Sequence, residues 1–371
     1  MDRSKWEYKK LGEVAKFING DRGVNYPSQS DFVEVGVPFV NAGHLKNNTI
    51  DYSSMNYITR EKFDKLGSGK IQKGDLLFCL RGSLGKKAIV DNIEEGAIAS
   101  SLVILRPSAI NTRFLSYYLE SPLINDEIER SNNGSSQPNL SAKSVSQFLI
   151  PIPQDEDQQR IVAELDCLNE MIAVKQEQLK EFDKLAQSIF YDMFGDPNNN
   201  EKSWQTEMWN DVFVTKTGKL NANAMDDNGL YPFFTCSKES YRINHFAFDC
   251  EALLLSGNNA TANYDVKYYK GKFNAYQRTY VLTIKNGNSY VYMKKALENK
   301  LEILQKESIG VMTKYLTMGI LSKISFCIPP LSLQQEFAEK ISAIEAQKEL
   351  VKQSIAETQQ LLDSRMDYYF D

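Results

Sequence analysis

The segment Ile152-Pro-Gln-Asp-Glu-Asp-Gln-Gln-Arg-Ile161 occurs in two versions in this chain of 371 residues. At an offset of 176 residues it lies over Ile328-Pro-Pro-Leu-Ser-Leu-Gln-Gln-Glu-Phe337, with the Ile-Pro and Gln-Gln pairs in register. The match extends without a gap from residues 134–195 onto residues 310–371. Because self-similarity at a fixed spacing is typical of a repeated architecture, we interpret the chain as a duplication.

A weaker match precedes each of these segments, at an offset of 198 residues. It places Trp6 on Trp204 and Gly20 on Gly218. The order is therefore block, helix, block, helix. This order predicts four parts: residues 1–153, residues 154–197 with a helix and a linker, residues 198–329, and residues 330–371 with a second helix.

The two helical segments follow Pro153 and Pro330, and proline suits a helix start because it cannot donate a hydrogen bond in a helix interior. Apolar residues in the first segment recur at steps of four and three, interrupted by Lys175, which is a heptad pattern. The second segment has the same seam, interrupted by Lys348, Thr358 and Arg365. Two equivalent helices can supply each other's partner, so we expect an antiparallel coiled coil. The alternative is that each helix packs only on its own block.

The blocks between the helices have a mixed pattern. Short apolar runs bounded by glycine and polar residues predict strands, and Asn111 before an amphipathic run predicts a capped helix. We expect strands at residues 36–40, 76–80, 86–90, 97–105, 251–255 and 280–284, and helices at 111–119 and 290–304. The fold class is therefore α+β, with two pseudo-repeated domains and two long helices.

The net charge of −5 is unevenly distributed. Residues 1–153 carry +2 and residues 204–329 carry +4, whereas residues 154–203 carry −7 and residues 330–371 carry −4. The acidity thus lies in the helical segments. Mildly basic blocks permit contact with phosphate without demonstrating it.

The composition also bears on metal sites and on the cellular compartment. Five cysteines form no Cys-x-x-Cys pair, and the only histidines are His44 and His245, so we expect no zinc site. The beginning of the sequence is polar and the longest apolar run, residues 76–80, is far too short to cross a membrane. We expect a soluble, cytoplasmic protein with free thiols.

Together, these features resemble the specificity subunits of type I restriction-modification enzymes over essentially the whole chain. The resemblance rests on the duplicated Ile-Pro and Gln-Gln pairs, on the opening from Trp6 to Val14, and on the strand Gly74-Asp-Leu-Leu-Phe followed by Arg81-Gly-x-x-Gly85. The second block departs from the pattern, since it opens Trp204-Gln-Thr-Glu-Met-Trp and has Ser256-Gly-Asn-Asn as its glycine loop.

The resemblance implies two target-recognition domains, each reading one half of a split site in double-stranded DNA. It implies two methyltransferase subunits and restriction subunits as partners. It does not imply binding to a membrane. S-adenosylmethionine, ATP and magnesium would be used by those partners, with no cofactor bound by this chain and no catalytic role for it.

Two other classes of protein compete with this interpretation. A coiled-coil scaffold would explain the helices but not the blocks before them. An enzyme lacks support, because there is no Asn-Pro-Pro-Tyr or Asp-Pro-Pro-Tyr motif for amino methylation, and because Gly67-Ser-Gly-Lys70 lacks the first glycine and the hydroxyl of a phosphate loop. The triplets Glu298-Asn-Lys300 and Glu7-Tyr-Lys9 offer only weak support for a nuclease.

Candidate DNA contacts lie in loops where basic, amide and aromatic residues gather. Arginine and lysine suit guanine and phosphate, and asparagine and glutamine suit adenine. On this basis we predict DNA-binding roles for Arg81, Lys86, Lys87, Gln137, Tyr276 and Arg278.

Overall fold

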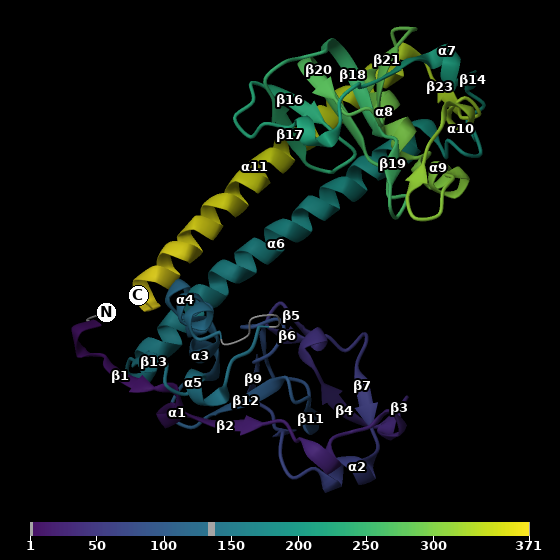
Figure 1. The fold of residues 1–371 in the computed structure, drawn as a ribbon. Coiled ribbons are helices and arrows are strands. Elements are labelled where there is room, and N and C mark those ends of the chain that lie inside the picture. Colours follow the sequence, from purple (N-terminus) through teal and green to yellow (C-terminus); the bar gives the residue numbers. More distant parts are fainter. Residues whose placement is uncertain (1–2, 133–137, 371) are drawn as a thin grey trace. The chain divides into compact units, whose positions relative to one another are not determined.

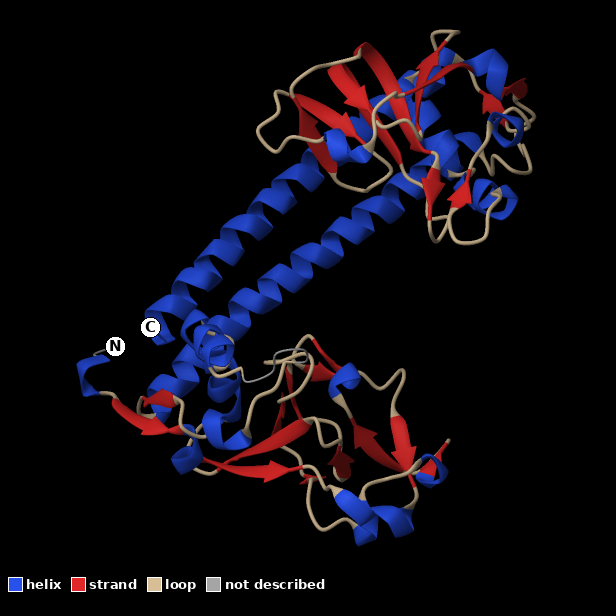
Figure 2. Cartoon of the chain, in the orientation of Figure 1, coloured by secondary structure: helices blue, strands red, loops and turns tan. Residues whose placement is uncertain are grey.

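The computed structural model describes residues 3–132 and 138–370. They form two compact units, drawn in Figure 1 with their elements labelled. Unit 1 comprises residues 1–175 and 354–371, and unit 2 comprises residues 176–353. Each unit contains helices and strands (Figure 2), so the predicted α+β class is confirmed. The longest helices are α6 (Asp155–Phe194) and α11 (Leu331–Phe370).

Each unit contains one part of α6 and one part of α11. In unit 1, the hydroxyl of Tyr369 donates to Glu164 at 2.5 Å, and the ammonium of Lys175 donates to Thr358 at 2.8 Å. Residue numbers therefore rise along one helix as they fall along the other, and the pair is antiparallel, as predicted.

Unit 2 repeats this arrangement with the opposite ends of the two helices. Lys348 lies 2.8 Å from Asp183, and the rings of Phe190 and Phe337 have centroids 5.6 Å apart. The interruptions of the heptad at Lys175 and Lys348 are thus polar contacts across the seam. Such contacts restrict the register of paired helices.

The described residues of unit 1 form two sheets and the pair β5 and β6, besides the pair β1 and β13. A four-stranded antiparallel sheet has the order β10-β9-β12-β2, and a five-stranded sheet has the order β3-β7-β4-β11-β8 with β4 and β11 parallel. The strands are β1 (Glu7–Lys10), β2 (Ala15–Asn19), β3 (Phe32–Val33), β4 (Val37–Val40), β5 (Leu45–Lys46), β6 (Thr49–Ile50), β7 (Asn56–Ile58), β8 (Lys70–Ile71), β9 (Leu76–Cys79), β10 (Lys87–Ile89), β11 (Gly96–Ile98), β12 (Leu102–Pro107) and β13 (Leu149–Ile152).

Helix α3 and parts of the two long helices pack against the four-stranded sheet. Phe114 and Tyr118 of α3 pack in one apolar core with Phe78 of β9, Ile161 of α6 and Phe370 of α11. The helices are α1 (Leu11–Val14), α2 (Arg60–Lys65), α3 (Thr112–Tyr118), α4 (Pro122–Arg130) and α5 (Ala142–Val145), with 3-10 turns η1 (Arg3–Lys5), η2 (Gly23–Asn25), η3 (Gln29–Asp31) and η4 (Ala42–His44).

Unit 2 is built around a six-stranded sheet with the order β15-β21-β18-β20-β16-β17, in which β16 and β20 are parallel. Its elements are β14 (Gln205–Met208), α7 (Trp209–Val212), β15 (Phe213–Thr217), η5 (Ala222–Ala224), β16 (Tyr231–Phe234), β17 (Ser240–Ile243), β18 (Phe248–Ser256), β19 (Asn258–Asn259), β20 (Val266–Ala275), β21 (Thr279–Ile284), α8 (Tyr290–Glu298), α9 (Leu301–Glu307), β22 (Lys314–Tyr315), α10 (Met318–Leu321) and β23 (Ser325–Ile328).

The two units share a framework, as the sequence repeat predicts. β1 pairs with β13 in unit 1 and β14 pairs with β23 in unit 2, both antiparallel. The amide of Leu11 donates to Phe148 at 2.9 Å, and the amide of Trp209 donates to Ile324 at the same distance. The departure from the repeat at Trp209 is therefore structurally neutral, because its side chain is fully buried where Leu11 is buried.

The duplicated Gln-Gln motif joins the start of each long helix to its own unit. Gln158 accepts a hydrogen bond from the amide of Asn111 at 2.9 Å and donates to the carbonyl of Pro153 at 3.0 Å. Asn111 is the N-cap of α3. The first glutamine of the motif is thus a buried clamp between two helix starts.

Gln334 makes the same contacts in unit 2. It accepts from the amide of Ser289, the N-cap of α8, at 2.9 Å, and it donates to Pro329 at 2.9 Å and to Asn288 at 2.8 Å. Both glutamines are buried, whereas Gln159 and Gln335 beside them are exposed. The motif therefore has a structural role in both units.

Two predicted elements differ from the structure. The strand expected at residues 97–105 is two strands, because the chain leaves the five-stranded sheet after Ile98 and enters the four-stranded sheet at Leu102. The helix expected at residues 290–304 ends at Glu298, and Lys300, which caps α9, turns its ammonium to the carbonyl of Pro197 at 3.1 Å. Within residues 3–132 and 138–370, none of the helices has the length and apolarity needed to cross a membrane.

Candidate nucleic-acid interface

The loop after β9 holds the first predicted contact, Arg81. The loop turns sharply at Gly82 (φ +81°) and Gly85 (φ +78°), a backbone conformation that favours glycine. The backbone of Arg81 bridges to Asn139, and its side-chain Nε donates to the amide oxygen of Asn139 at 3.2 Å. The guanidinium remains exposed, so it is positioned and still available to a ligand.

Arg81 also lines a cleft of about 630 Å³ in unit 1. The cleft brings together three cations from separate parts of the chain, Arg22, Arg81 and Lys143. Among the described residues, its only acidic lining residue is Asp21, which accepts hydrogen bonds from the backbone amides of Gly67 and Arg22. The remaining polar lining residues are amides and hydroxyls: Asn19, Ser68, Asn139 and Ser141.

Lys86 and Lys87 are adjacent in sequence but have different environments. Lys86 is exposed and lines a smaller cleft of about 340 Å³ with Lys46, Asn47 and Asn48. Lys87 is buried, and its ammonium lies 2.7 Å from the carboxylate of Glu120. Burial lowers the pKa of Lys87, although Glu120 opposes this effect. The ammonium of Lys87 is thus paired with a carboxylate inside the unit, and its contact with DNA stays a prediction. The predicted residue Gln137 lies outside the described residues.

Tyr276 and Arg278 lie together in unit 2, in the turn between β20 and β21. The amide of Tyr276 donates to Phe234 at 2.9 Å, and the carbonyl of Arg278 accepts from Gly257 at 2.8 Å. A Cβ on Gly257 would lie 2.3 Å from that carbonyl, so only glycine fits there. The turn is thus held on the framework.

Of these two side chains, Arg278 is the more accessible. Its guanidinium is exposed and lies over the ring of Tyr315, 5.7 Å from the centroid, whereas Tyr276 is half-buried. An exposed guanidinium on an aromatic face is well suited to phosphate or to a guanine edge.

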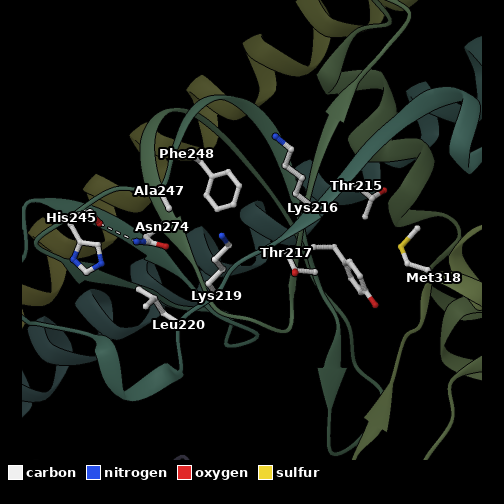
Figure 3. Close-up of a pocket in the computed structure, with 11 residues that line it drawn as sticks. Thr215, Lys216, Thr217, Lys219, Leu220, His245, Ala247, Phe248, Asn274 and Met318 are labelled. Carbon is white, nitrogen blue, oxygen red and sulfur yellow. Dashed lines mark hydrogen bonds between the residues drawn. The ribbon is translucent and has the colours of Figure 1, made fainter.

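Unit 2 has a larger cleft of about 700 Å³, which the sequence did not reveal. Figure 3 shows Lys216 and Lys219 within it, with His245 and Asn274 toward one side and Thr215 and Met318 toward the other. Asn274 is fixed by its hydrogen bond to the carbonyl of His245 at 3.2 Å. The signal that could have found this cleft is the match of Gly20 with Gly218, because Lys216 and Lys219 flank Gly218.

The two clefts lie at corresponding places in the two units. Both are lined by residues at the end of the strand β2 or β15. Gly20 and Gly218 directly follow these strands, and a Cβ on either would collide with a backbone carbonyl, that of Ala99 at 2.7 Å or that of Ala275 at 1.8 Å. The framework is therefore repeated.

The side chains that line the two clefts are not repeated. Asp21 and Arg22 in unit 1 stand where unit 2 has Lys219 and Leu220. Two copies of one framework with different polar linings can bind two different ligands of the same class.

These features define a duplicated α+β protein with a cation-lined cleft in each unit. A family model for the type I restriction modification DNA specificity domain matches residues 3–183 and again residues 201–360. The chain therefore belongs to this family, and each of its halves matches the family model.

Individual relatives show the same similarity over parts of the chain. The EcoDI specificity subunit of Escherichia coli is 38% identical over 160 residues, which cover 43% of this chain and 35% of that protein. The MjaVIII specificity subunit of Methanocaldococcus jannaschii is 25% identical over 191 residues, covering 50% of this chain and 44% of that protein. The matched part of this chain thus spans less than half the length of either relative.

The fold is similar to that of solved structures over nearly the whole chain. The S subunit of a type I restriction-modification system from M. genitalium has a TM-score of 0.60 at 15% identity, covering 99% of this chain and 96% of that one. A chain from work on assembly and conformational transition of the type I R-M system has a TM-score of 0.59 at 18% identity, covering 98% and 97%. The similarity confirms the predicted fold.

Proposed function

We propose that this chain is the specificity subunit of a type I restriction-modification enzyme and recognises a two-part sequence in double-stranded DNA. The observation that carries the proposal is the duplication itself. The family match covers both halves, and each unit places a differently lined, cation-bearing cleft on the same framework. Two different readers in one chain correspond to two different half-sites.

Cations and amides in these clefts fit the chemistry of DNA. Arginine and lysine neutralise phosphates, and amide groups match the hydrogen-bonding edge of adenine. Arg22, Arg81 and Lys143 in unit 1, and Lys216 and Lys219 in unit 2, supply the charge. We assign phosphate and base contacts first to these residues and to Arg278.

The chain would contribute sequence selection without a chemical step. Two methyltransferase subunits would methylate adenine with S-adenosylmethionine, and restriction subunits would use ATP and magnesium. Several of the relatives are named as specificity subunits, which supports this division of roles.

Long-read mapping of methylated adenines tests the proposal. The chain and its methyltransferase subunit would be expressed together in a host without other adenine methylation. A single split motif is expected. A methyltransferase that modifies the same sites with and without this chain would contradict the proposal, and so would a continuous motif.

A further inference from the structure

An apolar hairpin tip projects from unit 2. Val311 is 95% exposed and Met312 is 89% exposed. They lie in the hairpin of residues 309–315, which two backbone hydrogen bonds close: the amide of Tyr315 donates to Ile309 at 2.8 Å and the amide of Ile309 donates to Tyr315 at 3.2 Å. Neither side chain contributes to the core of the unit. Single exposed apolar residues are common in proteins, but two at the tip of a closed hairpin form one contact surface.

The hairpin has a fixed shape. Gly310 has φ +110°, and a Cβ there would lie 2.1 Å from the carbonyl of Thr313, so the tight turn requires glycine. The amide of Leu316 donates to Gly257 at 2.8 Å, which joins the base of the hairpin to the loop after β18. The framework therefore presents Val311 and Met312 in a defined place.

The surroundings of the tip have the chemistry of a DNA-binding surface. β22 of the hairpin carries Lys314 and pairs with Asn258 and Asn259 of β19. The guanidinium of Arg278 lies over Tyr315 of the same strand. Cations beside amides suit phosphates and base edges. An apolar tip on the same hairpin as such groups is suited to the one apolar group that a base presents in the major groove, the methyl group of thymine.

The corresponding loop of the first block has a different composition. At the offset of 176 residues, Ser135 and Ser136 stand in the sequence where the second block has Val311 and Met312. The structure does not describe those serines, so the comparison concerns the sequence alone. A change from hydroxyl to apolar groups at one position of the repeat is expected when the two copies select different bases.

We propose that Val311 and Met312 contact thymine methyl groups in the half-site that unit 2 reads, and so help to determine its sequence. This inference rests on the proposed function and names residues within it. Thymine differs from uracil only by that methyl group, so the contact can be probed without altering the protein.

The experiment uses the full chain in complex with its methyltransferase subunit and a duplex that carries the mapped site. Each thymine of the half-site is replaced by uracil in turn, and affinity is measured by titration. The complex with V311S/M312S is compared with wild type, and Leu230→Ser, at a 70% exposed position in the same unit, is the control. For wild type we expect a loss of about four-fold at one or more thymines, the factor that burial of one methyl group corresponds to.

For the double variant we expect weaker binding to the thymine duplex and no further loss with uracil. Unchanged wild-type affinity at every uracil, an equal loss in both proteins, or a half-site without thymine would overturn the inference. Failure of the double variant to assemble with the methyltransferase would also overturn it, because the tip would then be a protein contact. Absence of specific binding by the wild-type complex would instead refute the proposed function.

Discussion

Gln334 is a single side chain on which the start of α11 and the start of α8 both depend. We expect Gln334→Ala to lower the free energy of unfolding by about 1–3 kcal/mol, because it leaves the buried amide of Ser289 and the carbonyl of Pro329 without their partner. Chemical denaturation of the full chain measures this loss. Hydrogen exchange at the Ser289 amide should accelerate at the same time.

The neighbouring residue Gln335 provides the matched control. It is exposed and follows Gln334 in the same turn of α11, so Gln335→Ala should change stability by less than about 0.5 kcal/mol. Equal effects of the two substitutions would mean that the clamp does not hold the two helix starts. Gln158 and Gln159 allow the same comparison in unit 1.

Tyr369 gives the fold a specific dependence on alkaline pH. Burial, together with its hydrogen bond to Glu164, raises its pKa from 10.0 to about 12. The phenol therefore ionises more readily in the unfolded chain, so its contribution to stability is complete below pH 10 and is lost as the pH rises to about 12. We expect Tyr369→Phe to lose less stability than wild type over that interval, as followed by circular dichroism.

Tyr368 beside it serves as the reference. Its side chain is 44% exposed, and Tyr368→Phe removes a neighbouring phenol hydroxyl without removing the hydrogen bond to Glu164. An identical profile for wild type and Tyr369→Phe would show that other groups account for the alkaline loss.

Single residues also mark where sequence analysis reached its limit. The motif Gln-Gln was recognised from its repetition, but its role as a clamp depends on Asn111 and Ser289, which lie 45 or more residues before it. Lys86 and Lys87 could not be told apart, because adjacent residues at the start of a strand point to opposite faces and composition does not say which face is buried. The cations Lys216, in β15, and Lys219, in the loop after it, were missed since charge at such positions looks like ordinary solvated surface.

Among the elements, the start of α11 packs through an aromatic cluster. Phe337 is fully buried and lies within 5.6 Å, centroid to centroid, of both Phe190 and Phe194. We expect Phe337→Ala to destabilise the fold by about 3–5 kcal/mol, through lost burial and the cavity left behind. Thermal or chemical denaturation measures the effect.

Leu350 on the same helix is 60% exposed and is the control for this substitution. Leu350→Ala should alter stability by no more than about 0.5 kcal/mol. A small loss for Phe337→Ala would mean that the cluster is not a stabilising element of unit 2.

Helices and strands were predicted well where an apolar pattern continues over many residues. They were predicted poorly where a strand or helix is interrupted. The heptads predicted both long helices, because an apolar step that repeats over many turns is specific to helices that pair along a seam. The division of residues 97–105 into β11 and β12 could not be foreseen, since Ser100 and Ser101 alone do not show that the chain changes sheets. Periodicity also could not show that each unit uses the start of one helix and the end of the other.

At the scale of the whole molecule, the duplication predicts that each block recognises its half of the DNA motif independently of the other block. Exchange of residues 204–329 for the equivalent block of another specificity subunit should change one half of the methylated motif and leave the other half unchanged. The shared framework makes the exchange feasible, because α7, β14 and β23 repeat the contacts of α1, β1 and β13. Methylation mapping of the exchanged chain gives the answer.

The reciprocal exchange of residues 1–153 should change only the other half of the motif. A change in both halves after either exchange would refute independent reading. Loss of all methylation with a soluble, assembled complex would show that the blocks are not interchangeable at these boundaries.

The composition of unit 1 has a consequence for the order in which the chain folds during synthesis. Met366, Tyr369 and Phe370 belong to the core of unit 1, although the ribosome adds them after all of unit 2 has been made. Unit 2 ends at Gln353, so every residue that it needs is available earlier. The unit that begins the chain is therefore the last that can be completed. Until then the core of unit 1 is incomplete, because each unit uses the start of one long helix and the end of the other.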